Sequence, residues 1–122
     1  MTTVPRNLDT KTATPEQEHL RALAAKYYSD KDILKAEIDR LFFRTWQYAC
    51  HTSELAEPSA YVTVSLLGQN IFVIRDDEGE IRAYYNVCPH RGHKLVEGTG
   101  KKRVIVCPYH QWSFTLDGRL RS

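Results

Sequence analysis

Cysteine is scarce in this sequence, and its small number excludes a disulfide framework. The 122 residues include three cysteines, Cys50, Cys88 and Cys107. An odd number of cysteines, behind an N-terminus with no apolar core that could act as a secretory signal, predicts a reducing, cytoplasmic setting. In that setting, a cysteine placed beside a histidine indicates metal binding or catalysis rather than a covalent cross-link.

Long apolar runs, internal repeats and a strong net charge are missing as well. The longest apolar runs are short, so no segment of this sequence is expected to span a membrane. The formal net charge of +2 is too small to indicate a nucleic acid or an anionic membrane as a partner. What remains is a chain long enough for one domain with one core, and its 42% of hydrophobic residues is typical of a globular protein.

Two stretches at the start of the chain lack strand-like alternation. Residues 1–17 are polar, and we expect them to form a flexible N-terminal arm. Residues 18–45 predict a helical segment, whose main helix runs over residues 30–44 after a cap at Ser29. Its apolar side chains recur at helical spacing: Leu34, Ile38, Leu41 and Phe42. This stripe predicts that the helix lies on something larger than itself.

From Tyr61 onward, short runs of β-branched and aromatic residues alternate with turn residues. The strands that we expect are residues 61–66, 71–74, 81–85, 101–106, 112–116 and 119–120. The dipeptide Asp117-Gly118 marks the turn of the last hairpin. Short strands at close spacing predict a mainly β fold, a small antiparallel sandwich or barrel with an N-terminal helix.

Cys50 and His51 are adjacent and follow residues 46–49, a stretch that predicts a short strand or extended chain. Adjacent residues on an extended segment point to opposite faces, so this pair suits a shared metal ion poorly. We expect a buried thiol and a hydrogen-bonded imidazole instead.

Two short clusters of potential metal ligands lie further along the chain. The first is CPH, from Cys88 to His90, and the second is CPYH, from Cys107 to His110; sixteen residues separate them. One interpretation is a zinc ion held by two cysteines and two histidines. However, Cα atoms two residues apart on an extended loop lie roughly 6.5 Å apart, because the rise is about 3.3 Å per residue. That spacing suits a binuclear iron–sulfur cluster better, with the two cysteines on one iron and the two histidines on the other.

Four neighbouring residues fit such a centre. Gly92 permits a close backbone approach, which would let backbone N–H groups point at the sulfurs. Tyr109 and Ser113 carry hydroxyls near enough in sequence to hydrogen-bond a sulfur, and Trp112 offers an apolar cover. We therefore expect these four residues to surround the ligands.

The motifs CPHRGH and CPYHQW resemble the Rieske signature, Cys-x-His followed after a spacer by Cys-x-x-His. The flanking sequences LFFRTWQYACHTSEL, YVTVSLLGQNIFVIRDDEGEIRAYYNV and SFTLDGRL resemble the N-terminal part of the α subunit of Rieske non-haem iron oxygenases. The resemblance implies a Rieske [2Fe–2S] domain of the β-sandwich type over residues 46–122, with two metal-binding loops. Its ligands would be Cys88, His90, Cys107 and His110.

Two further comparisons of residues narrow the subtype that the resemblance implies. Respiratory and photosynthetic Rieske proteins carry an extra cysteine in each loop, joined as a disulfide, whereas this chain has His93 and Tyr109 at the matching positions. The site therefore resembles the disulfide-free class of oxygenases and ferredoxins. A stand-alone Rieske ferredoxin is one alternative, but the roughly sixty residues before Tyr61 resemble an oxygenase subunit more.

The phrases SELAEPSAYVT, AYYNVCPHRGHKL and CPYHQW resemble most the branch that acts on quaternary ammonium compounds such as carnitine, betaines and choline. An aromatic-ring-hydroxylating dioxygenase α subunit is the other alternative. In either case the resemblance implies an oxidoreductase that uses O₂ and NAD(P)H, with a flavin- or ferredoxin-type reductase passing electrons to the cluster. The cluster would then reduce a mononuclear Fe(II) in the catalytic domain of the same or a neighbouring subunit of a homotrimer.

That mononuclear iron needs two histidines and a carboxylate, which the family carries in a stretch after the Rieske domain. The histidines left after the two ligands are scattered, and no such stretch is present. We therefore expect the chain to be an N-terminal fragment of a longer subunit, with no catalytic residues of its own and with the catalytic domain absent.

Overall fold

The computed structural model describes residues 22–122, which fall into two units with the boundary between Glu37 and Ile38. The expected flexible arm over residues 1–17 lies outside the described residues, as does the start of the helical segment expected over residues 18–45. No helix within residues 22–122 has both the length and the apolar character needed to cross a bilayer.

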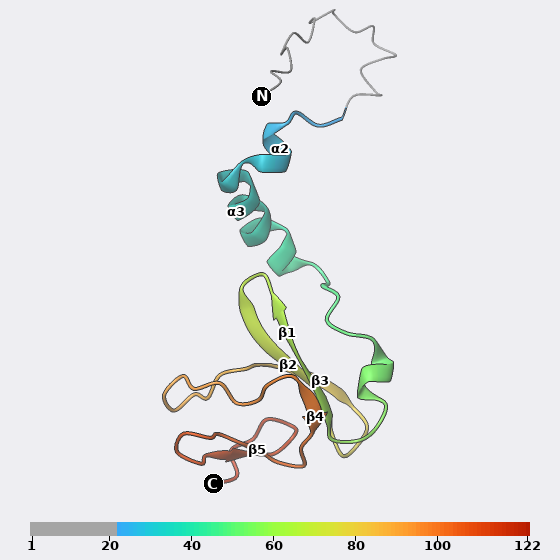
Figure 1. Ribbon diagram of the computed structural model, residues 1–122, viewed down its shortest axis with the longest axis vertical. Coiled ribbons are helices and arrows are strands. Elements are labelled where there is room, and N and C mark those ends of the chain that lie inside the picture. Colours follow the sequence, from blue (N-terminus) through green and yellow to red (C-terminus); the bar gives the residue numbers. More distant parts are fainter. Residues whose placement is uncertain (1–21) are drawn as a thin grey trace, which may run out of the picture. The chain divides into compact units, whose positions relative to one another are not determined.

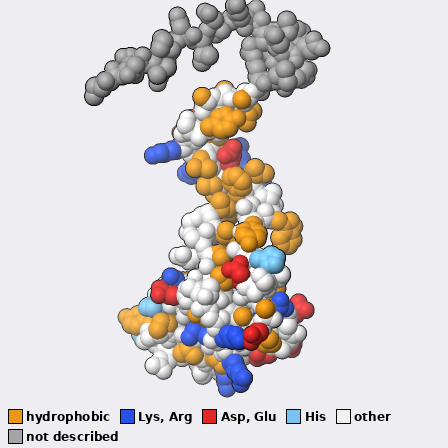
Figure 2. All heavy atoms as spheres, turned by 45° about the vertical axis from the view of Figure 1, so that its right-hand side comes forward, with side chains coloured by type: hydrophobic (Ala, Val, Ile, Leu, Met, Phe, Trp, Pro, Cys, Tyr) orange, Lys and Arg blue, Asp and Glu red, His pale blue; other side chains and the backbone are white. Residues whose placement is uncertain are grey.

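Two helices follow the first described residues (Figure 1): α2 (Lys26–Ser29) and α3 (Lys31–Arg40). Neither helix buries a side chain, and apolar side chains show on this part of the surface in Figure 2. Asp30, rather than the expected Ser29, caps α3. Its Oδ1 accepts hydrogen bonds from the N–H groups of Asp32 (2.8 Å) and Ile33 (3.4 Å), as an N-cap side chain does.

The main helix ends at Arg40, four residues before the expected end at residue 44. The chain continues as a short 3₁₀ turn, η1 (Phe42–Arg44). Polar side chains take the carbonyls that a continuing helix would use. The Thr45 hydroxyl donates to the Leu41 carbonyl (3.1 Å), and the Gln47 amide donates to the Phe42 carbonyl (3.1 Å). Such local bonds compete with helix propagation.

The described part of the second unit is mainly β and antiparallel, as the sequence predicts (Figure 1). A four-stranded sheet has the order β3-β2-β1-β4, and a two-stranded sheet pairs β5 with β6. The strands are β1 (Ala60–Leu66), β2 (Gln69–Arg75), β3 (Ile81–Tyr85), β4 (Thr99–Lys101), β5 (Ile105–Val106) and β6 (Ser113–Phe114). The β1–β2 hairpin turns at Leu67 and Gly68, both with positive φ, as a tight two-residue hairpin requires.

Three expected strands differ in the structure. The single strand predicted over residues 101–106 is divided: β4 pairs with β1, whereas β5 pairs with β6. The division falls where consecutive charged residues end one sheet and the buried Ile105 begins the other. The last hairpin is shorter than predicted, with two residues in β6 and one further bridge between Phe114 and Leu120. Residues 46–49, expected as a short strand or extended chain, have no regular secondary structure.

The four-stranded sheet buries apolar side chains on both faces. One face packs against the segment that carries β5 and β6, through Tyr61, Phe72, Ile74, Val96, Ile105 and Leu116, which we call the inner cluster. The other face packs against a 3₁₀ turn, η2 (Thr52–Leu55), through Leu55, Ala60, Val62 and Val73, which we call the outer cluster. The sheet is therefore the layer on which the two loops of the candidate site are mounted.

In the Cys50–His51 pair, the imidazole is hydrogen-bonded as the sequence predicts, whereas the thiol is less buried than expected. Cys50 is half-buried against the outer cluster. His51 begins η2: its Nδ1 accepts from the Ser53 N–H (3.2 Å), and its own N–H donates to Oε1 of Glu54 (2.9 Å). This reciprocal capping satisfies backbone donors at the start of the turn.

Candidate metal centre

The two predicted ligand clusters lie in two loops with the same backbone fold. We call residues Cys88–His93 loop 1 and residues Cys107–Trp112 loop 2. In loop 1 the Cys88 N–H donates to the His93 carbonyl (2.7 Å), and the Gly92 N–H donates to the Cys88 carbonyl (2.9 Å). Loop 2 repeats both bonds: Cys107 to Trp112 (2.8 Å) and Gln111 to Cys107 (3.0 Å). The sequence therefore builds one ligand-bearing loop twice.

Each loop turns at a residue in the left-handed region. Gly92 has φ 71° in loop 1, and Gln111 has φ 62° at the same place in loop 2. A Cβ added to Gly92 would meet no heavy atom of the protein within 4 Å. The positive φ, which glycine adopts without strain, is therefore a reason for glycine at this position, and the close backbone approach to a cluster stays a prediction.

The two cysteine side chains meet in the interior. Cys88 is 1% exposed and Cys107 is 2% exposed, and neither forms a disulfide. Burial acts to raise the pKa of the Cys107 thiol, but hydrogen bonds to its sulfur from the N–H groups of Tyr109 and His110 and from the Cys88 thiol leave the pKa lower than usual. These donors favour the thiolate, which is the form that binds metals.

The two histidine side chains meet at the surface. His90 and His110 are exposed, and their ring centroids lie 4.7 Å apart at an interplanar angle of 65°. Trp112 lies parallel to His90, with ring centroids 4.7 Å apart and an angle of 4° between the planes. The predicted cover by Trp112 is thus a stack on one imidazole. The site has a buried sulfur end and an exposed imidazole end.

The donor set fits a binuclear iron–sulfur cluster. Loop 1 and loop 2 each offer one thiolate and one imidazole, and each iron of a [2Fe–2S] cluster with mixed ligands takes two protein ligands. Within residues 22–122, no group of three or more Cys, His, Asp or Glu side chains is close enough to hold one metal ion.

The remaining predicted neighbours also lie around the two loops. Tyr109 is half-exposed, and the centroid of its ring lies 3.8 Å from the centroid of the His110 ring. Ser113 is buried, and its hydroxyl pairs with the hydroxyl of Ser122 at 2.7 Å. Because a hydroxyl both donates and accepts, the Ser113 hydroxyl can form a second hydrogen bond besides this one. The hydrogen bonds predicted from the Tyr109 and Ser113 hydroxyls to a sulfur stay predictions.

Sequence reasoning missed a residue that braces loop 1. Asn86 is 4% exposed and uses both ends of its amide. Its Nδ2 donates to the Val96 carbonyl (2.8 Å), and its Oδ1 accepts from the N–H groups of Leu95 and Val96 (3.0 Å each). These bonds join the two ends of the stretch that contains loop 1. The signal available in the sequence was a polar residue between the apolar strand β3 and Cys88.

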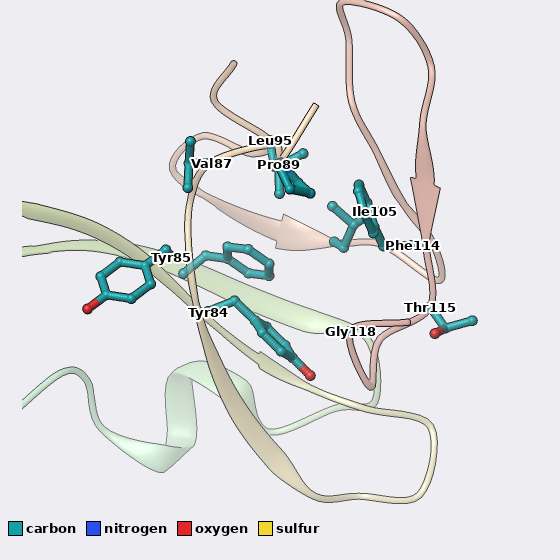
Figure 3. Close-up of a pocket in the computed structure, with 10 residues that line it drawn as sticks. Tyr84, Tyr85, Val87, Pro89, Leu95, Ile105, Phe114, Thr115 and Gly118 are labelled. Carbon is teal, nitrogen blue, oxygen red and sulfur yellow. The ribbon is translucent and has the colours of Figure 1, made fainter. Parts of the chain in front are cut away.

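An apolar hollow of about 270 Å³ lies beside loop 1 and between the two sheets. Figure 3 shows side chains around it from β3 (Tyr84), loop 1 (Pro89) and β6 (Phe114). Its lining is mostly apolar, and it holds none of the four candidate ligands. The chemistry of this part of the molecule therefore belongs to the loops and not to the hollow.

Residues 45–122 match the Rieske [2Fe–2S] domain family. The carnitine monooxygenase oxygenase subunit of Acinetobacter baumannii is 47% identical over 95 residues, which are 77% of this chain and 26% of that protein. The corresponding subunit of Escherichia coli K12 is 46% identical over 99 residues (80% and 26%). The chloroplastic choline monooxygenase of Amaranthus tricolor is 45% identical over 94 residues (77% and 21%).

Solved structures agree with these relatives in fold. A quaternary ammonium Rieske monooxygenase, CntA, in complex with L-carnitine superimposes with a TM-score of 0.77 at 46% identity, over 80% of this chain and 28% of that chain. Naphthalene 1,2-dioxygenase with indole bound gives a TM-score of 0.72 at 36% identity, over 78% and 22%. The chain spans about a quarter of the length of the carnitine monooxygenase subunits that it matches. The chain therefore belongs to the Rieske [2Fe–2S] domain family, and its Rieske domain is homologous to that of the oxygenase subunits of Rieske monooxygenases.

Proposed function

We propose that this chain is the electron-relay domain of an O₂-dependent Rieske oxygenase subunit, with Cys88 and Cys107 ligating one iron and His90 and His110 the other. The observation that carries the proposal is the arrangement of the side chains. Two loops of the same fold pair their sulfurs in the interior and their imidazoles at the surface. This is the arrangement in which a cluster is shielded at one end and can exchange electrons at the other.

A bound [2Fe–2S] cluster supplies one-electron chemistry, and imidazole ligands raise its potential above that of an all-cysteine cluster. The residues of the chain shape that chemistry from two sides. Backbone N–H groups of Tyr109 and His110 point at the Cys107 sulfur and stabilise negative charge there. The exposed rings of His90 and His110 present their outer nitrogens to a partner, and the stacked Trp112 holds the orientation of His90.

The substrate class that we propose is a quaternary ammonium compound. Support comes from the relatives, which include carnitine monooxygenase, choline monooxygenase and glycine betaine monooxygenase. Electrons would come from NAD(P)H through a flavin- or ferredoxin-type reductase and would pass on to a mononuclear Fe(II) in the catalytic domain. One solved structure of a quaternary ammonium Rieske monooxygenase is described as giving insights into inter-subunit electron transfer. We propose the same route here, between neighbouring subunits of a homotrimer.

Aromatic-ring dihydroxylation is the second candidate, because naphthalene 1,2-dioxygenase has a similar fold at 36% identity. The two candidates are distinguished by O₂ uptake with the full-length protein and its reductase. Carnitine, choline and glycine betaine should stimulate uptake with formation of a hydroxylated or N-dealkylated product. Stimulation by naphthalene alone would favour the dioxygenase instead. An independently active carrier with no associated catalytic domain would favour the stand-alone ferredoxin.

The ligand assignment has its own test. The purified protein should contain iron and acid-labile sulfide in equal amounts, and replacing Cys88 or Cys107 by serine should abolish its visible absorbance. His110→Cys should keep iron but lower the reduction potential, because a thiolate places more negative charge on the cluster than an imidazole. Cys50→Ser, which removes a thiol packed against the outer cluster, is the control and should leave the spectrum unchanged. Stoichiometric zinc without sulfide would falsify the assignment.

A further inference from the structure

Aromatic rings join loop 1 to loop 2 at three places. His90 contacts His110 and Trp112, as described above. The third contact involves no candidate ligand: the ring of His93 in loop 1 lies 5.8 Å from the ring of Tyr109 in loop 2, tilted by 43°. The sequence alone suggested no role for His93 beyond that of a loop residue, so this contact needs an explanation.

The imidazole of His93 is held by the backbone of the next residue. Its Nδ1 lies 2.7 Å from the Lys94 carbonyl oxygen. Because a carbonyl accepts and cannot donate, Nδ1 carries the hydrogen in this bond. The His93 carbonyl in turn accepts from the Cys88 N–H, which closes loop 1 (2.7 Å). The ring is thus anchored to the base of the loop that carries Cys88 and His90.

Tyr109 lies between His93 and a candidate ligand. Its ring is 3.8 Å from the His110 ring, at an angle of 35°. Tyr109 also lies two residues after Cys107 in the same loop. A displacement of Tyr109 would therefore be felt by both ligands of loop 2. His93 is the aromatic neighbour from the opposite loop that limits such a displacement.

We propose that His93 is a positioning residue that acts through Tyr109: it holds the Tyr109 ring against the His110 imidazole and clasps loop 1 to loop 2. This inference rests on the proposed assignment of His110 as a ligand. A tilted aromatic pair strengthens an association by about twofold to tenfold beyond its buried area. Loss of the clasp should therefore loosen the imidazole end of the site without unfolding the domain.

The test compares ring-removing with ring-keeping variants in the cluster-loaded protein. His93→Ala and Tyr109→Ala should each speed the loss of visible absorbance in excess chelator by roughly twofold to tenfold. They should also shift the g-values, or broaden the signals, in the electron paramagnetic resonance spectrum of the reduced cluster, because the g-values report the orientation of the histidine ligands. Tyr109→Phe keeps its ring and should behave like the wild type, whereas His93→Phe keeps the ring contact but loses the Nδ1–H bond to the Lys94 carbonyl and should lie closer to the wild type than His93→Ala does. Unchanged g-values in His93→Ala would overturn the proposal, even if its thermal stability fell.

Coupling between the two residues gives a second criterion. If His93 acts through Tyr109, the double variant His93→Ala/Tyr109→Ala should lose its cluster no faster than the faster single variant. Effects that multiply in the double variant would show that the two residues act independently and would contradict the clasp.

A cross-link tests the loop contact without relying on a cluster. In cluster-free protein, His93→Cys/Tyr109→Cys should lose two more titratable thiols on mild oxidation than the wild type, whose Cys88 and Cys107 side chains already adjoin, and should regain them with dithiothreitol, because the two positions face each other across the loops. Absence of the cross-link would overturn the clasp. If the wild type never holds iron and sulfide but the cross-link forms, the proposed function fails while the loop contact stands.

Discussion

At the scale of single residues, Gly92 and Gln111 show how one backbone fold is written twice with different residues. Both lie four residues after a candidate cysteine ligand, and both have positive φ. Glycine adopts this region freely, whereas a residue with a Cβ pays roughly 1–2 kcal/mol in the left-handed conformation. Loop 2 therefore stores strain at a position where loop 1 has none.

Substituting these two residues should have opposite effects. Gly92→Ala should lower the free energy of unfolding by about 1 kcal/mol, because the added Cβ meets open space and the cost is conformational. Gln111→Gly should raise it by up to about 1 kcal/mol, since relief of strain exceeds the extra chain entropy of glycine. Urea denaturation of the cluster-free protein measures both. An Ala variant at Gly92 as stable as the wild type would contradict the account.

Gly118→Ala provides a calibrated comparison for that pair. Gly118 has φ 90°, and a Cβ there would lie 2.8 Å from Cε1 of Tyr84, so a clash adds to the strain. Its loss of stability should exceed that of Gly92→Ala. Equal losses would mean that the structure around Tyr84 relaxes freely.

The residues of the candidate site differ in how well a sequence can predict them. Cys88, His90, Cys107 and His110 could be found because their chemistry and spacing are unusual. Asn86 and His93 could not, since each acts through contacts made after the chain has folded back on itself. Histidine and asparagine are ordinary loop residues until a partner is known. The family resemblance places His93 and Tyr109 where other Rieske proteins have a disulfide, and in the structure the two rings lie against each other.

At the scale of elements, hydrophobic alternation predicts strands well where one sheet uses the whole run. β3 has the bounds expected from the sequence, β1 begins one residue earlier, and β2 begins two residues earlier and ends one residue later. The run over residues 101–106 misleads because its two halves serve different sheets, a tertiary choice that no local pattern records. The early end of α3 likewise depends on two side chains further along, Thr45 and Gln47, which donate to the Leu41 and Phe42 carbonyls just after the helix.

The β2–β3 connection depends on one buried carboxylate. Asp76 is 4% exposed; its Oδ1 accepts from the N–H groups of Glu78 (3.0 Å) and Glu80 (2.8 Å), and its Oδ2 accepts from Nε of Arg82 (2.7 Å). The hydrogen bond from Arg82 holds the pKa of Asp76 below its usual value, against the opposing effect of burial, and the two backbone donors lower it further. The turn is thus stabilised by the ionised form.

This arrangement predicts a pH dependence of stability. Because the folded pKa is depressed, the contribution of Asp76 is fully present above its unfolded pKa of about 3.9 and is lost as the pH falls through the folded value. Asp76→Asn should be less stable than the wild type at pH 7 and should lose less stability on acidification. Asp77→Asn, at the exposed neighbouring position, is the matched control. Parallel stability curves for Asp76→Asn and the wild type between pH 2 and 7 would contradict this role.

At the scale of the whole molecule, the two faces of the sheet have different tasks. The inner cluster attaches the segment that carries both loops, and Ile105 in it lies two residues before Cys107. The outer cluster attaches η2 to the opposite face through Leu55. Both residues are almost completely buried, at 2% and 0% exposure. Both clusters therefore stabilise the fold, whereas the geometry of the candidate centre depends on the inner cluster alone.

Truncating one residue in each cluster separates these tasks. Leu55→Ala and Ile105→Ala should each lower the free energy of unfolding by about 2–5 kcal/mol, the usual cost of emptying a core position. Ile105→Ala alone should also speed the loss of visible absorbance under native conditions. The space left by the truncated side chain lies beneath the strand that leads into loop 2. The comparison is made at a temperature where circular dichroism shows both variants folded. If Leu55→Ala loses its absorbance as fast as an equally destabilised Ile105→Ala, the cluster senses global stability, and the division of labour between the two faces is wrong.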